Sequence, residues 1–301
     1  MTVDDARKGE HAMVPAVHHR TTDVDGLDVF YREAGDAQSP TVVLLHGFPT
    51  SSHMFRNLIP ALADRYHVIA PDHIGFGQSA MPPLGDFPYT FEALTDVTAG
   101  LLHKLGVHRF ALYVQDYGAP LGWRLALQDP DRVTAIVTQN GNAYEEGFVK
   151  SFWDGLFAYA GDPTPATEAP LRAALTVEVT RWQYLNGVAD PTLVSPDNWV
   201  HDQALLDRPG NAEIQLKLFR DYPTNVALYP RVHAYFRDSR VPLLAVWGAH
   251  DEIFGPAGAE AFRADLPDAE IHLIESGHFA LESHLETVTG HIRDFLGRVL
   301  D

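Results

Sequence analysis

The chain has 301 residues, 46% of them hydrophobic, which is enough for one large core or for one core with an inserted lobe. Its 22 basic and 40 acidic residues give a formal charge of −18, which argues against nucleic acid as a partner, and the absence of cysteine excludes disulfides and thiolate chemistry. No apolar run approaches the roughly 18 residues of a membrane span, and residues 1–15 lack the apolar segment of a secretory signal. We therefore expect a flexible tail over residues 1–15 and a cytoplasmic protein without a membrane partner.

The first half of the chain alternates between strand-like and helix-like segments. Apolar or β-branched runs predict strands, and apolar residues three or four apart predict helices. A hairpin is predicted around the Asp25-Gly26 turn. Its strands cover 17–22 and 27–33, further strands follow at 41–45, 67–70, 109–114 and 133–138, and the helices between them carry apolar stripes at 54–62, at 91–105 and from 119 onward. This alternation indicates a mostly parallel sheet with helices on both faces.

The pattern changes between residues 142 and 228. Prolines, aromatic residues and helical stripes occur there without strands, so we interpret this segment as an inserted helical lid. The alternation resumes with a strand at 242–247, a helix at 256–265, a strand at 270–274 and a last helix from Leu285 to Val299. The predicted organisation is an α/β core over 16–141 and 229–301, with the lid over 142–228.

The segment from Arg109 to Gly122 carries the most informative motif. A predicted strand ends at Val114, the polar Asp116 follows, and a helix starts near Ala119. A strand that turns sharply into a helix with one polar residue at the apex is typical of a nucleophile elbow, although Val114 stands where the first glycine of that motif is expected. The alternative is that Asp116 only caps the helix, a position that aspartate favours.

Two further ionisable residues follow predicted strands. Asp251 comes four residues after Trp247, and His278 comes four residues after Ile274. The chain order Asp116, Asp251, His278 is that of the nucleophile, acid and base of catalytic triads on such sheets. Because the carboxyl ends of parallel strands meet at one edge of a sheet, we predict that these three side chains lie together and are catalytic.

These motifs resemble the aspartate-nucleophile branch of the α/β-hydrolase fold superfamily, which contains epoxide hydrolases and haloalkane dehalogenases. The segments HGFPTSSHMFRNLIP, PDHIGFGQS, VQDYGAP, WGAHD and SGHF carry the resemblance, which extends from about residue 17 to the C-terminus and is loose in the lid. It implies an α/β-hydrolase fold with a mostly parallel eight-stranded sheet flanked by helices. It also implies that the backbone amides of Phe48 and Tyr117 form an oxyanion hole and that a cis bond precedes the proline of HGFP.

The chemistry of aspartate fits this resemblance. A carboxylate is already ionised at neutral pH and needs no base to attack a saturated carbon. Such an attack opens an epoxide or displaces a halide and leaves an alkyl ester on Asp116. Water then cleaves the ester, with His278 as its base and Asp251 orienting the imidazole.

The two reactions need different groups in the lid. Epoxide opening needs an acid for the alkoxide; the resembling enzymes use one or two lid tyrosines. Tyr229 is the first candidate here, and Tyr184 or Tyr159 is the candidate for the second. Halide departure needs N–H donors, and Phe48 and Tyr117 stand where dehalogenases carry Asn and Trp. We therefore predict an epoxide hydrolase that uses water and a small apolar epoxide.

Two alternatives stay open. One is a haloalkane or haloacid dehalogenase, for which Trp153 or Trp199 would have to serve the halide. The other is a non-catalytic ligand-binding protein on the same fold. No metal-ligand spacing and no dinucleotide motif occurs, so we expect neither metal nor cofactor, and the sequence does not indicate an oligomeric state.

Overall fold

The computed structural model describes residues 15–300, so the tail predicted for residues 1–15 lies, apart from Pro15, outside the described residues. The described chain forms one eight-stranded sheet in the order β1-β2-β4-β3-β5-β6-β7-β8. The first two strands and the β2–β4 pair are antiparallel, and every other neighbouring pair is parallel. The strands are β1 (His18–Val24), β2 (Leu27–Ala34), β3 (Thr41–Leu45), β4 (His67–Pro71), β5 (Phe110–Val114), β6 (Val133–Thr138), β7 (Leu243–Gly248) and β8 (Glu270–Ile274).

Helices cover both faces of this sheet, because the central strands bury side chains on both sides. In β3, Val43 and Leu45 pack into one hydrophobic cluster, whereas Val42 and Leu44 pack into the other. The first cluster includes α2 (Phe91–Lys104), α3 (Gly118–Gln128), α9 (Pro223–Ser239) and α10 (Ala257–Ala261). The second includes α1 (Leu58–Leu62), α11 (Ala280–Ser283) and α12 (Leu285–Val299).

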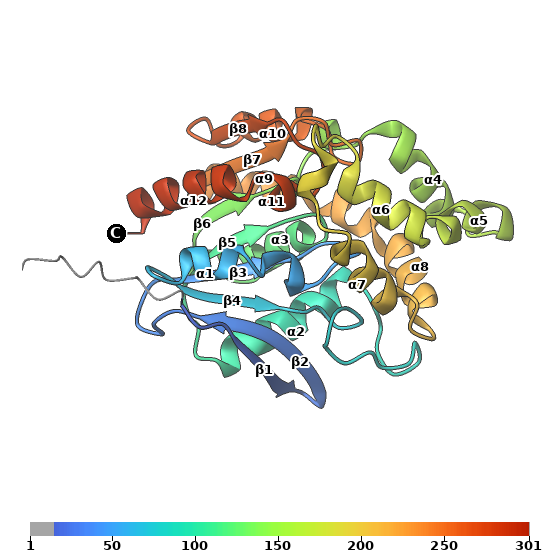
Figure 1. Ribbon diagram of the computed structural model, residues 1–301, viewed down its shortest axis with the longest axis horizontal. Helices are drawn as coiled ribbons and strands as arrows, with labels where there is room; N and C mark the ends of the chain where they lie inside the picture. Colours follow the sequence, from blue (N-terminus) through green and yellow to red (C-terminus); the bar gives the residue numbers. More distant parts are fainter. Residues whose placement is uncertain (1–14, 301) are drawn as a thin grey trace, which may run out of the picture.

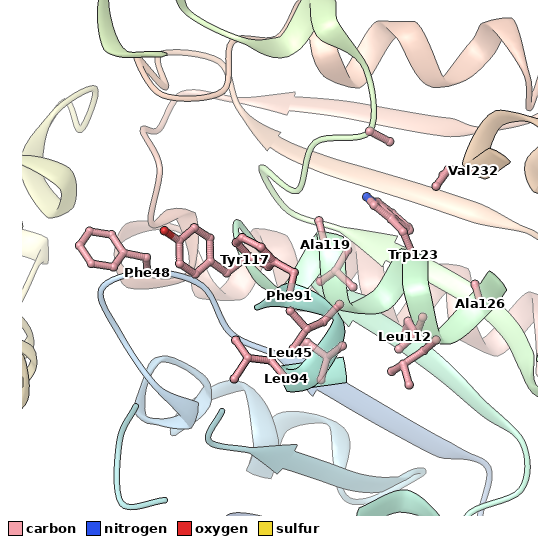
Figure 2. Close-up of a cluster of buried hydrophobic side chains, with 14 of the residues drawn as sticks. Leu45, Phe48, Phe91, Leu94, Leu112, Tyr117, Ala119, Trp123, Ala126 and Val232 are labelled. Atoms are coloured by element: carbon pink, nitrogen blue, oxygen red, sulfur yellow. The ribbon is translucent and has the colours of Figure 1, made fainter. Parts of the chain in front are cut away.

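Figure 2 shows the part of the first cluster that supports the elbow. Phe91 of α2 lies beside Tyr117, and Trp123 of α3 lies near Val232 of α9. The Trp123 ring is also 5.5 Å from the ring of Phe236, edge to face. These contacts fix α3, and with it the turn that precedes α3, against the sheet.

The lid consists of α4 (Lys150–Gly161), α5 (Pro165–Ala173), α6 (Val177–Leu185), α7 (Asp197–Leu206) and α8 (Asn211–Asp221). In Figure 1 these helices gather at the end of the molecule toward which the arrow of β4 points. Helix α9 crosses residue 228, where we predicted the lid to end. It packs against α3 of the core through Phe236, because its apolar residues continue the stripe that faces Trp123.

One predicted helix is divided in the structure. The apolar stripe over 54–62 forms a short 3-10 helix (Ser52–Phe55) followed by α1. Pro60 has no N–H group, so a continuous helix would leave the Arg56 carbonyl without its hydrogen-bond donor. Starting α1 at Leu58 places the proline in the first turn, where no donor is needed. None of the described helices combines the length and apolar character that a bilayer span requires.

Candidate active site

The sharp turn after β5 presents Asp116 at the edge of the sheet. Asp116 has φ +47°, the left-handed region, which costs a non-glycine residue on the order of 1 kcal/mol. Gly118 begins α3, and a Cβ atom at that position would lie 2.0 Å from the carbonyl oxygen of Leu45. A side chain is therefore impossible at residue 118, whereas Val114 is accommodated where the motif usually has its other glycine. The cap position of α3 is Tyr117, without a side-chain hydrogen bond, so Asp116 does not act as a helix cap.

The Asp116 carboxylate is buried and held from one side by backbone amides. The Phe48 N–H donates to Oδ1 at 2.6 Å, and the peptide bond between Phe48 and Pro49 is cis. Burial raises the pKa of Asp116 above its ordinary value, while His278 and the amides of Phe48 and Tyr117 oppose that shift. Both amides predicted for the oxyanion hole thus lie at the carboxylate.

His278 lies between the two predicted carboxylates. Its Nδ1 is 2.8 Å from Asp251 Oδ2, and its Nε2 is 4.0 Å from Asp116 Oδ2. Because a carboxylate only accepts hydrogen bonds, Nδ1 carries the proton of the neutral imidazole and Nε2 is the free base. Burial alone would lower the pKa of His278, but the charges of Asp251 and Asp116 outweigh it and raise the pKa above its ordinary value.

Asn140, for which no role was predicted, contacts the predicted catalytic acid. Its Nδ2 donates to Asp251 Oδ2 at 2.8 Å, and its Oδ1 accepts from the Gly248 N–H at 2.9 Å. The Ile253 N–H donates to the other oxygen of Asp251 at 2.7 Å. Asp251 is therefore oriented by donors on two sides. The signal for Asn140 in the sequence was its place just after the strand ending at Thr138.

Gln115 is a second residue without a predicted role. Its buried Nε2 lies 2.8 Å from His278 Nε2, so the amide donates to the lone pair of the neutral imidazole. Gln139 Nε2 donates to the backbone oxygen of His278 at 2.9 Å.

We call Asp116, Asp251 and His278, together with Asn140 and Phe48, the catalytic edge. All five residues lie in the loops that follow the carboxyl ends of strands.

A cavity of about 260 Å³ opens above Asp116. The catalytic edge contributes Asp116 and Phe48, and Tyr117 lies beside them; Figure 2 shows the Phe48 and Tyr117 rings next to each other. The other walls come mainly from the lid. We call the cavity roof those lining residues that belong to α4, α5, α6 and α8: Ser151, Phe152, Trp153, Gly155, Leu156, Pro170, Leu171, Val179, Gln183 and Phe219. Most of them are apolar, so a bound substrate would be largely shielded from water.

The predicted tyrosines Tyr229, Tyr184 and Tyr159 are not among the residues that line this cavity. The Tyr184 hydroxyl donates to Asp202 Oδ2, and its ring stacks on Phe279 with centroids 4.1 Å apart. The Tyr229 hydroxyl is 3.4 Å from Asn142 Nδ2, and Tyr229 borders a different groove, on the side of Glu145.

Tyr222, for which no role was predicted, does not line the cavity either, but it contacts two residues that do. Its ring is 4.4 Å from that of Trp153 and 6.2 Å from that of Tyr117, and both of these residues line the cavity. Burial raises the pKa of Tyr222 well above its ordinary value, and Tyr229 and Asp116 raise it further. Its hydroxyl is therefore protonated at neutral pH and within electrostatic reach of Asp116. Within residues 15–300 this hydroxyl has no hydrogen-bond partner.

The tryptophans offer the cavity no free N–H group. Trp153 lines it, but its Nε1 donates to the Ile253 carbonyl at 2.8 Å. Trp182 and Trp199 do not line it. In the part of the chain that the structure describes, no group of three or more acidic, histidine or cysteine side chains could hold a metal ion.

The amino-acid sequence of this chain is similar to a known family and to individual hydrolases. A family model described as alpha/beta hydrolase fold matches residues 40–285. An uncharacterized hydrolase of Saccharomyces cerevisiae is 45% identical over 284 residues, which cover 91% of this chain and 95% of the relative. A haloalkane dehalogenase of Mesorhizobium japonicum is 30% identical over 90% of this chain and 88% of its own length.

Solved structures agree with the sequence comparison. Haloalkane dehalogenase DbeA from Bradyrhizobium elkani has a TM-score of 0.78 and 25% identity, over 95% of this chain and 98% of that one. Epoxide hydrolases are also among the sequence and structural neighbours. The predicted fold class and the resemblance to the aspartate-nucleophile branch are thereby confirmed.

Proposed function

Because this chain belongs to the α/β-hydrolase fold family, we propose that it is a hydrolase that forms a covalent alkyl ester on Asp116 and that its substrates are epoxides. One observation carries the proposal. The Asp116 carboxylate projects into a largely apolar cavity, with Oδ1 held by the Phe48 amide and Oδ2 4.0 Å from His278 Nε2. This arrangement offers a nucleophilic oxygen to the substrate and a base to the following water.

In the first step Asp116 Oδ2 attacks a ring carbon of the epoxide. The new C–O bond forms as the ring C–O bond breaks, and the ring oxygen becomes an alkoxide that needs a proton. Tyr222 is the acid best supported by the packing, because it is buried, protonated and without a partner within the described residues. The raised pKa of Tyr222 keeps its hydroxyl protonated at neutral pH, so a proton is available for the alkoxide.

In the second step water attacks the Asp116 carbonyl carbon while His278 Nε2 takes its proton. The oxyanion forms on Oδ1, where each amide donor stabilises it by about 3 kcal/mol. Its collapse breaks the bond between the carbonyl carbon and the ester oxygen, and the leaving alkoxide takes the proton from His278 to give the diol. Asp116 then ionises, and its proton replaces the one that Tyr222 donated in the first step. Ester formation removes the negative charge of Asp116, which is one of the charges that raise the pKa of His278. Alkylation therefore lowers the pKa of the imidazole, which favours its neutral form at the stage that requires a base.

The lack of a free indole N–H among the described residues that line the cavity favours epoxide over halide. A leaving halide needs N–H groups, and the one indole that lines the cavity already donates to Ile253. An opened epoxide needs a hydroxyl acid, which Tyr222 can supply. Dehalogenation is the second candidate, and the similarity to a haloalkane dehalogenase over 90% of this chain favours it.

Trapping the ester tests both candidates. His278→Ala removes the base of the second step but leaves the nucleophile, so we expect it to accumulate a covalent adduct with 1,2-epoxyhexane. Intact mass identifies the chemistry, because an epoxide adds its whole mass and 1-bromohexane adds only the hexyl group. The double variant Asp116→Asn/His278→Ala is the control and should stay unmodified. A His278→Ala protein that remains unmodified with panels of epoxides and haloalkanes would overturn the proposal.

A further inference from the structure

The cavity roof contains one buried polar side chain. Apart from residues 116 and 117, the polar side chains that line the cavity are Ser151 and Gln183. Ser151 is exposed at the surface, whereas Gln183 is only 3% exposed. Gln183 is thus the one buried polar group that the described lid residues present to the substrate space.

Gln183 differs from the other buried glutamines in having no partner. Within residues 15–300 its carboxamide makes no hydrogen bond with protein. The others are each bonded through the side chain: Gln115 to His278, Gln139 to Asn140, Gln203 to Thr180 and Gln215 to Asn211. A ligand that fills the cavity excludes water from this carboxamide, so a ligand that supplies a hydrogen-bond partner binds more tightly than one that does not.

The helix that carries Gln183 is fixed against the catalytic loop. Val179 and Gln183, one turn apart on α6, both line the cavity. The next residue, Tyr184, stacks on Phe279 at 4.1 Å, and a Cβ atom at Gly277 would lie 1.8 Å from the Asn186 carbonyl oxygen. Helix α6 therefore contacts the residues on both sides of His278, and Gln183 is held in a defined position over that side of the cavity.

We propose that Gln183 is a specificity-determining residue that donates a hydrogen bond to a second oxygen of the substrate. Its NH₂ group has two donors, which suit an ether or carbonyl oxygen. The preferred substrates are then epoxides with an additional acceptor oxygen rather than hydrocarbon epoxides. A volume of about 260 Å³ is that of about nine liquid water molecules, so the substrate has on the order of ten non-hydrogen atoms. This inference rests on the proposed function, since it concerns the same cavity.

A pair of matched epoxides tests the inference. Ethyl glycidyl ether differs from 1,2-epoxyhexane only by an oxygen in place of one CH₂ group, so their ratio of kcat/KM isolates the second oxygen. Gln183→Met keeps the side-chain length and removes both polar ends. We expect this variant to lower the ether-to-hydrocarbon ratio about tenfold relative to the unmodified protein. Comparing ratios between proteins cancels the difference in intrinsic reactivity of the two epoxides.

Val179→Leu is the matched control, because it alters the same wall without removing a polar group. It should change kcat/KM for both epoxides alike and leave their ratio within about twofold. An unchanged ratio in Gln183→Met, with both epoxides still forming the ester in His278→Ala, would overturn the inference and leave the proposed function intact.

The product diols give a readout that does not depend on the reaction. Calorimetry with 3-ethoxypropane-1,2-diol and hexane-1,2-diol measures whether the second oxygen improves binding. We expect a preference for the ether diol that Gln183→Met abolishes. If the unmodified protein turns over neither epoxide, the proposed function fails for this class while the diols still decide the inference; equal affinity for both diols, or no binding of either, would overturn it.

Discussion

The catalytic edge and the cavity roof are built by different forces. At the edge, short hydrogen bonds fix each side chain, as between His278 Nδ1 and Asp251 Oδ2 at 2.8 Å or from the Phe48 amide to Asp116 at 2.6 Å. In the roof, rings pack against rings, as Phe152 against Trp182 and Trp153 against Tyr222. Hydrogen bonds are directional, so the edge admits few substitutions. Apolar packing tolerates changes of shape, so the roof is where substrate preference can vary.

The largest effect that this comparison predicts is at the nucleophile. Asp116→Asn removes the attacking charge while its side-chain oxygen still accepts from Phe48, so we expect kcat for a turned-over epoxide to fall about 10⁴-fold or more. Single-turnover kinetics with that epoxide measures the loss. Residual activity within tenfold of the unmodified protein would mean that the edge does not carry the chemistry.

Asp116→Asn also tests how the buried charge of Asp116 affects the stability of the protein. Because burial raises the folded-state pKa of Asp116, its ionised form destabilises the native state above that pKa, and this penalty disappears as the pH falls below the unfolded pKa. Asp116→Asn should therefore raise the free energy of unfolding by on the order of 1 kcal/mol at neutral pH, and by less in acid. Urea unfolding at several pH values measures the difference.

The lid offers a contrasting effect, on stability rather than on turnover. Burial raises the pKa of Asp202 from 3.8 to about 7, and Tyr184 opposes that shift. Protonated Asp202 thus contributes stability that is fully present below pH 3.8 and is lost as the pH rises to about 7. Asp202→Asn keeps the neutral form, so at pH 8 we expect it to be about 2–4 kcal/mol more stable than the unmodified protein.

The control for this change is the acid range, where the two proteins should have nearly equal unfolding free energies. We expect kcat/KM at neutral pH to change less than about threefold, because Asp202 does not line the cavity. Loss of turnover comparable to that of Asp116→Asn would contradict the distinction between edge and lid. Chemical denaturation across pH 4 to 8, with parallel assays, decides this.

Two tyrosine substitutions test which lid hydroxyl protonates the alkoxide. Tyr222→Phe removes the proposed acid, so we expect the rate of ester formation with an epoxide to fall about 100-fold. Tyr229→Phe is the matched control and should change that rate less than about twofold, because Tyr229 borders another groove. Stopped-flow measurement in the His278→Ala background isolates this step. The reverse ranking would return the acid to Tyr229.

The smallest effect that we expect on turnover is at Asn140. Removing its amide in Asn140→Ala leaves Asp251 Oδ2 with one donor fewer, so we expect ester hydrolysis to slow about tenfold while ester formation is unchanged. Asn142→Ala is the control from the same strand end; it loses a bond to the Tyr144 carbonyl and none to Asp251. Burst kinetics separate the two steps, and equal slowing of both in Asn140→Ala would contradict a role through Asp251.

The sequence was sufficient to predict the fold and to place Asp116, Asp251 and His278 at one edge of the sheet. Apolar runs identified the parallel strands, and parallel strands bring their carboxyl ends to one edge whatever the loops do. Asp116, Asp251 and His278 could thus be placed together from their order alone, and in the structure His278 lies 2.8 Å from Asp251 and 4.0 Å from Asp116. Asn140 was visible at the same edge, but its partner depends on its left-handed φ of +49°, which periodicity does not reveal.

Only the tertiary structure decided which lid side chains face the substrate. The sequence does not distinguish the three lid tyrosines. In the structure, however, Tyr184 contacts Asp202, Tyr222 contacts Trp153 and Tyr229 contacts Asn142. A helix repeats every 3.6 residues, so the sequence gives relative directions along it but not its rotation against the core. Long-range contacts set that rotation. For the same reason Gln183, rather than a predicted tyrosine, is the buried polar group of the cavity roof.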